Sequence, residues 1–157
     1  MKDSAKVTFN PLRIFGFSLA MAYIMGEVFN TYYILHKSIN LIGIILLLLF
    51  LLIFYLSVRI FLVHKEKLPP STPTYVIIKT GVYSYSRNPI YCSFVGFQFS
   101  MFMVFENITY IISSIGLFFW IHYFVVLREE EYLLKKFGKK YERYKCNVPR
   151  WLFKKII

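Results

Sequence analysis

The chain has 157 residues, of which 57% are hydrophobic and 20% aromatic, and its 19 Lys and Arg against 8 Asp and Glu give a formal net charge of +11. This length allows about one domain, and this apolar content excludes intrinsic disorder and argues against an ordinary soluble globule. The surplus apolar side chains must face something other than water.

Four apolar stretches along the chain are candidate membrane spans. A helix needs about 20 mostly apolar residues to cross a bilayer core, and the stretches cover residues 14–34, 41–62, 90–105 and 108–127. The third is the shortest, so it is either a membrane-buried helix or a short, tilted span. The sequence therefore predicts an all-α polytopic membrane helix bundle of about four spans, folded as a single domain over residues 1–157.

The basic residues are distributed unevenly around these stretches. They gather before the first stretch, between the second and third, and after the fourth, whereas the two opposite loops carry few charges. By the positive-inside rule, both termini and the long middle loop are cytoplasmic. The charge therefore favours contact with anionic lipid headgroups rather than nucleic acid. The first stretch has no small-residue cleavage site after it, so we interpret it as a retained anchor and not a signal peptide.

Several common kinds of site are missing from the sequence. The two cysteines, Cys92 and Cys146, are far apart and give neither a disulfide framework nor a zinc spacing, and no metal site is expected. There is no Gly-rich dinucleotide loop, no P-loop and no GxSxG elbow. Any cofactor must therefore be held by helix ends and loops at the membrane surface.

The first candidate constellation covers residues 80–91, just before the third stretch. Asn88 followed by Pro89 is typical of a helix N-cap with proline at the first helical position. The free N–H groups of such a helix start attract anions, and Tyr83, Tyr85 and Tyr91 surround it with aromatic rings. The alternative is an interfacial aromatic belt beside a capped helix.

The second constellation covers residues 128–151, after the fourth stretch. Glu129, Glu130 and Glu131 lie at a membrane boundary where cations are favoured, so a positive partner is expected beside them. The alternative is a solvated helix face. An amphipathic C-terminal helix is predicted from the helical spacing of four apolar side chains: Leu133, Phe137, Tyr141 and Tyr144.

Two further ionisable residues, Glu27 and His122, lie inside predicted spans. Such residues are by default functional-site hypotheses. Contact with a kink or a partner helix is the alternative for both. They are the two features that favour a small-solute transporter, although the inverted repeats typical of that class are not found in the sequence.

Together, the two constellations resemble a known family. Arg87-Asn88-Pro89-Ile90-Tyr91, followed by a Glu-Glu pair and by a Val-Pro-Arg-Trp run near the C-terminus, is similar to the isoprenylcysteine carboxyl methyltransferases and the related phospholipid N-methyltransferases. The signature of that family is Arg-His-Pro-x-Tyr-x-Gly before the Glu pair, and the resemblance covers residues 80–151. Two positions differ: Asn88 replaces the His and Ser93 replaces the Gly. Because Asn does not titrate near neutrality, a general base at that position is not expected.

The resemblance implies an integral membrane enzyme that uses S-adenosylmethionine as its cofactor. The Glu pair would meet the cationic part of the cofactor, the tyrosine rings would add cation–π contacts, and Arg87 or the helix start would meet its carboxylate. The Glu pair would also take the proton from an amine acceptor, and Arg128 would orient an anionic one. The expected cofactor-binding residues are Tyr83, Tyr85, Arg87, Asn88, Pro89, Tyr91, Glu129, Glu130 and Tyr141, and the expected catalytic residues are Glu129, Glu130 and Arg128.

The expected acceptor is a membrane-embedded amphiphile, either a prenylated cysteine carboxylate or a lipid headgroup. The sequence leaves open whether oxygen, nitrogen or sulfur is methylated, and it leaves the oligomeric state open. Two alternatives from other classes are a non-enzymatic membrane subunit, which would dock partners through its basic loops, and the small-solute transporter.

Overall fold

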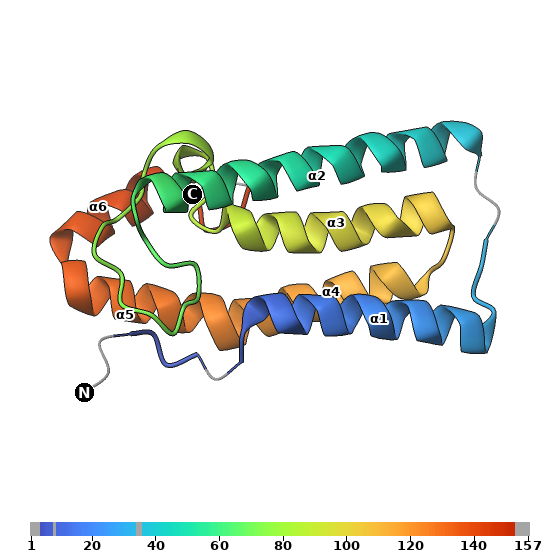
Figure 1. The fold of residues 1–157 in the computed structure, drawn as a ribbon, viewed down its shortest axis with the longest axis horizontal. Coiled ribbons are helices and arrows are strands. Elements are labelled where there is room, and N and C mark those ends of the chain that lie inside the picture. Colours follow the sequence, from blue (N-terminus) through green and yellow to red (C-terminus); the bar gives the residue numbers. More distant parts are fainter. Residues whose placement is uncertain (1–3, 8, 34–35, 153–157) are drawn as a thin grey trace.

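The protein is a helical bundle in the computed structural model, which describes residues 4–7, 9–33 and 36–152 (Figure 1). No strand occurs in these ranges apart from an isolated bridge between Tyr32 and Asn107. The helices are α1 (Pro11–Phe29), α2 (Lys37–Val63), the 3₁₀ turn η1 (Gly81–Ser84), α3 (Pro89–Phe105), α4 (Thr109–Ile121), the π-helical turn η2 (His122–Val126), α5 (Leu127–Phe137) and α6 (Lys139–Asn147).

Three helices are long and apolar enough to cross a membrane: α1, α2, and the continuous rod Thr109–Phe137 that α4, η2 and α5 form together. In the most apolar 18-residue stretch of each of α1 and α2, only 11% is buried inside the protein. Most of the apolar side chains of these two helices therefore face outward. The fourth apolar helix, α3, has 17 residues and is about 25 Å long, slightly less than a bilayer core of about 30 Å. These features confirm the predicted helical membrane bundle.

The first helix is offset from the stretch predicted for it. Asn10 caps it by accepting the N–H of Leu12, and it ends at Phe29, because Asn30 takes the left-handed conformation and donates its N–H to the carbonyl of Gly26. Asn is one of the few residues that tolerates that conformation at a helix end. Of the predicted stretch 14–34, the helix therefore covers the part up to Phe29, and residue 34 lies outside the described residues.

The helices pack in the order α2, α3, α4, α1, with α2 against α3, α3 against α4 and α4 against α1 (Figure 1). A buried polar contact joins three of them in mid-bundle: the amide of Gln98 in α3 accepts from the Ser18 hydroxyl of α1 and donates to Ser113 of α4. Gln98 is fully buried. Interhelical hydrogen bonds of this kind fix helix positions within an apolar bundle. The main apolar core consists of Tyr91, Phe94, Leu117, Ile121, Val125 and Val126.

The C-terminal part was predicted as one amphipathic helix and is two. The chain breaks at Gly138, whose φ of 50° and ψ of −128° belong to a region that side chains other than glycine rarely adopt. The break folds α6 back against α5. Tyr141 and Tyr144 of α6 pack against Leu133 and Phe137 of α5. The predicted apolar side chains therefore do cluster, but across a turn and not along one helix face.

Candidate functional site

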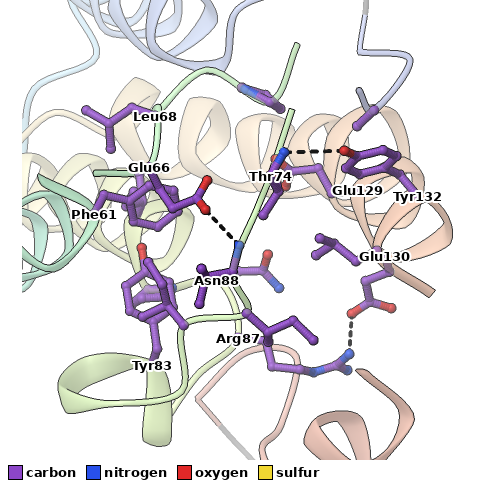
Figure 2. A pocket seen from close by; sticks show the side chains of 18 of the residues that line it. Phe61, Glu66, Leu68, Thr74, Tyr83, Arg87, Asn88, Glu129, Glu130 and Tyr132 are labelled. Atoms are coloured by element: carbon purple, nitrogen blue, oxygen red, sulfur yellow. Dashed lines mark hydrogen bonds and ion pairs between the residues drawn. The ribbon is translucent and has the colours of Figure 1, made fainter. Parts of the chain in front are cut away.

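A cavity of about 120 Å³ lies where α2 ends, α3 begins and α5 leaves the bundle, and we call this the cavity end (Figure 2). Three parts of the chain surround it: the loop after α2, the first turn of α3 with the residues before it, and the helices α5 and α6. Ligand pockets usually measure about 300–1,000 Å³. The loop after α2 forms part of the lining, so a movement of this loop would change the volume of the cavity.

That loop, residues 66–78, is called the covering loop here, and polar contacts hold it in place. The Glu66 carboxylate accepts the backbone N–H groups of Tyr75 at 2.8 Å and Val76 at 2.7 Å. The Thr74 N–H donates to the Tyr132 hydroxyl of α5 at 3.3 Å, a bond that Figure 2 shows. The loop contains no helix, as its three prolines require.

The start of α3 is positioned as predicted, but its capping is different. Asn88 occupies the N-cap position before Pro89, and its side chain makes no capping hydrogen bond. Its amide nitrogen instead donates to the carbonyl of Arg150 at 2.9 Å. The backbone N–H of Arg87 likewise donates to the carbonyl of Pro149, at 3.0 Å. The C-terminal segment therefore holds the loop in front of α3, and the expectation that the Asn88 side chain caps α3 was wrong.

One glutamate binds two arginines at the wall of the cavity. Nη1 of Arg87 lies 2.8 Å from Oε1 of Glu130, and Arg150 donates to the same carboxylate twice, from Nε at 3.0 Å and from Nη2 at 2.7 Å. Arg87 and Glu130 are each only 8% exposed at their side chains. Two-pronged bonds of this kind fix both partners in orientation. Because two guanidinium groups share one carboxylate, the cluster keeps one positive charge.

Glu129, the neighbour of Glu130, has different surroundings. Its carboxylate accepts a hydrogen bond of 3.1 Å from the Tyr91 hydroxyl, and it has no cationic partner among the described residues. The other carboxylates that line the cavity are engaged, Glu66 by backbone N–H groups and Glu130 by arginines. Among the described residues, Glu129 is therefore the carboxylate of the cavity lining that has neither a cation nor a backbone N–H as its partner.

Tyrosines form an aromatic side of the cavity. Tyr144 donates its hydroxyl to the carbonyl of Tyr83 at 2.7 Å, whereas the buried hydroxyl of Tyr83 has no hydrogen-bond partner among the described residues. Burial raises the pKa of Tyr83 far above its ordinary value, and burial with the nearby Glu130 charge raises the pKa of Tyr141 to about 12. These phenols are therefore neutral at physiological pH and act only as hydrogen-bonding and aromatic groups.

Most of the residues expected to bind the cofactor or to act in catalysis meet at this cavity, and two do not. Tyr85 is 75% exposed and lies outside the lining. Arg128 also lies outside it and donates to the carbonyl of Lys6 at 2.9 Å. The lining includes Tyr83, Arg87, Asn88, Pro89, Tyr91, Glu129, Glu130 and Tyr141.

Three contributors to the site were not assigned a role from sequence. Glu66 holds the covering loop, Tyr132 receives it, and Arg150 fixes Glu130. Glu66 is a single acid within a run of basic residues, and that contrast could have marked it as a residue with a structural role. Arg150 belongs to the Val-Pro-Arg-Trp run quoted for the resemblance. No sequence signal marks Tyr132.

Glu27 and His122 lie outside the cavity lining. Glu27 is exposed on α1 and accepts from the Tyr32 hydroxyl, and His122 accepts the indole N–H of Trp151 at 3.3 Å. Within the described parts of the chain, no three His, Cys, Asp or Glu residues are grouped to hold a metal ion.

Fold and site together define a helical membrane protein with a polar, ion-paired cavity at one end of its bundle. Residues 39–140 match the model of the phospholipid methyltransferase family, known as PEMT, over more than half of the chain. The chain therefore belongs to the phospholipid methyltransferase family, whose members transfer methyl groups to lipid-type substrates. A search among curated proteins and a search among solved structures found no match.

Proposed function

We propose that this protein uses S-adenosylmethionine to methylate the amine headgroup of a membrane phospholipid. Membership of the phospholipid methyltransferase family supports methyl transfer to a lipid. The observation that carries the cofactor assignment is the Glu129 carboxylate, which lines the cavity and has, among the described residues, a tyrosine hydroxyl as its only partner.

The donor set around the cavity fits the charges of this cofactor. Glu129 would bind its ammonium group, and the guanidinium of Arg87, which lines the cavity, would attract its carboxylate. The unpartnered hydroxyl of Tyr83 offers one further hydrogen bond. We assign Glu130 a different task from that of Glu129: it orients the two arginines. When bound, the cofactor supplies a methyl group activated by its sulfonium.

The protein's own contribution to methyl transfer is mainly positioning. A phospholipid amine must reach the site in its neutral form, because only the neutral amine has a free electron pair. Asn88, which stands where the related enzymes have His, has no titratable group to take that proton. A prenylated cysteine carboxylate would need no such proton transfer and is the alternative acceptor.

Calorimetric titration with S-adenosylhomocysteine tests the cofactor site, since this product analogue cannot turn over. We expect Glu129→Gln to weaken binding by about tenfold to a hundredfold, as expected for the loss of a charged hydrogen bond of about 1.5–3 kcal/mol. The control is Glu131→Gln, on the same helix. Glu131 is exposed and paired with Lys135, so that substitution should leave the affinity unchanged.

Each other outcome has a definite meaning. Equal affinity in wild type and Glu129→Gln, together with lost turnover, would assign Glu129 to the acceptor amine and contradict the proposed ammonium site. No binding by a folded wild-type protein would contradict the cofactor proposal and favour a non-enzymatic membrane subunit.

A further inference from the structure

A second hollow, with a volume of about 700 Å³, opens on the side of the bundle between α2, α3 and α4. We call it the side groove. Its walls are largely apolar and come from three helices and the C-terminal segment: Phe50, Val95, Phe99, Ile115, Phe118 and Trp151 are among them. Among the described residues, no charged side chain lines it. The side groove therefore suits hydrocarbon and not a polar headgroup.

The side groove and the cavity share a wall. On α3, Tyr91 lines the cavity and its neighbour Cys92 lines the side groove. In the C-terminal segment, Arg150 holds Glu130 of the cavity, while the next residue, Trp151, lines the side groove. The bond from Asn88 to the carbonyl of Arg150 ties these two parts of the wall together. One turn of helix and one short segment thus separate the two hollows.

The length of the side groove along α3 fits within one leaflet of a bilayer. Along α3 it extends from Cys92 to Phe99, which is about 10 Å of helix. Half of a hydrocarbon core of about 30 Å is about 15 Å. Because Cys92 lies in the first turn of α3, the side groove starts at the cavity end and runs toward the middle of the bundle.

The charge at the end of the side groove suits a phosphate. Arg150 is 33% exposed and shares the single carboxylate of Glu130 with Arg87, so a positive charge remains beside Trp151. A phospholipid has the same order of groups, with a chain, then a phosphate, then the headgroup. Laid along the side groove, it would place its phosphate near Arg150 and its headgroup toward the cavity.

We propose that the side groove binds one hydrocarbon chain of the phospholipid acceptor and so fixes its headgroup beside the cavity. This proposal rests on the proposed function for the identity of the lipid. The proposal also predicts that a lipid chain binds in the side groove, however, and that binding can be measured without turnover.

The binding test uses Trp151 as the reporter. The chain has two tryptophans, so Trp120→Phe leaves Trp151 alone. We expect saturable quenching of its fluorescence by a phosphatidylethanolamine brominated in its chains, in nanodiscs of unlabelled phosphatidylcholine. Ile115→Phe, which fills the side groove, should weaken this quenching. Ile112→Phe, on the same helix but outside the lining, should not; Ile115 and Ile112 are 52% and 65% exposed.

The catalytic test compares a long-chain phosphatidylethanolamine with a short-chain analogue that has the same headgroup. Ile115→Phe should lower kcat/KM for the long-chain lipid, because the larger side chain removes the space and the packing contacts of the bound chain; the displaced methylenes move into bilayer hydrocarbon and not into water, so the loss comes from packing and positioning. The short-chain analogue, the Ile112→Phe control and binding of S-adenosylhomocysteine should be unaffected.

Quenching that does not saturate, or that is equal in both variants, would mean ordinary bilayer contact and would overturn the proposal. A loss of kcat/KM that is the same for both lipids would overturn it as well. Saturable quenching without any methylation would instead contradict the proposed function and leave the chain site standing.

Discussion

Glu129 and Glu130 are neighbours with the same side chain, yet their surroundings differ. Consecutive helix residues point about 100° apart, so Glu130 faces two arginines while Glu129 faces Tyr91. The sequence predicted an acidic pair with one shared role, the binding of a cation. The structure supports a division of labour, because a carboxylate bound by two guanidinium groups has no free capacity for a third cation.

Arg150 provides a test of this division. We expect Arg150→Lys to lower the free energy of unfolding by about 1–2 kcal/mol, because lysine cannot reproduce the two-pronged bond to Glu130. Arg143→Lys is the matched control, since Arg143 is exposed on α6. The measurement is thermal unfolding in detergent. Equal melting temperatures for the two variants would show that the two-pronged bond between Arg150 and Glu130 is not needed for stability.

Tyr141 predicts how stability depends on alkaline pH. Its pKa is raised from 10.0 to about 12 in the folded protein, chiefly by burial. A group whose pKa rises on folding stabilises the protein below its unfolded pKa and loses that contribution as the pH rises through the folded value. The melting temperature should therefore fall between about pH 10 and 12. Tyr141→Phe should reduce this fall, and an identical pH profile would contradict the prediction.

At the scale of elements, Gly138 decides how the C-terminal helices are arranged. Its positive φ of 50° favours glycine, and a Cβ there would meet no atom within 4 Å. Gly138→Ala should therefore destabilise the protein through backbone strain alone, by about 1–3 kcal/mol. Gly116→Ala in α4 has the same free space without the positive φ and should be nearly neutral. Chemical denaturation of both variants in detergent would check this difference.

The covering loop is the second element with a measurable consequence. The covering loop lines a cavity of about 120 Å³, and Glu66 holds the loop through two backbone N–H groups, so we expect ligand exchange to depend on the opening of this loop. We expect Glu66→Ala to speed both association and dissociation of S-adenosylhomocysteine by about tenfold or more, the equivalent of about 1.5–3 kcal/mol. Surface plasmon resonance would measure both rates, and unchanged rates would show that the loop does not gate the cavity.

For the whole molecule, the charge distribution predicts which side of the membrane carries the cavity. Cys146 on α6 is exposed and Cys92 is buried, so a membrane-impermeant maleimide should label Cys146 alone. With the cavity end in the cytoplasm, inside-out vesicles should be labelled and intact cells should not. Cys146→Ser should abolish the labelling. Labelling of intact cells would reverse the predicted orientation.

The sequence by itself determined the class of fold and eight of the residues that line the cavity. Apolar stretches of membrane length and the distribution of basic residues depend on local composition, which needs no contacts to be interpreted. The Arg-Asn-Pro motif and the Glu pair likewise identified Arg87, Tyr91 and Glu129 as neighbours, although they lie far apart in the chain.

Only the tertiary structure decided which polar side chains already have a hydrogen-bond or ion-pair partner within the protein. The side chain of Asn88 binds the carbonyl of Arg150 and makes no capping bond to α3. Glu130 is paired with two arginines, whereas Glu129 is not. Arg128 binds the N-terminal segment outside the cavity. Each of these outcomes depends on a partner distant in sequence, whose approach is set by the packing of helices and by the turn at Gly138. A local pattern shows which side chains are available, and packing determines which of them are already satisfied.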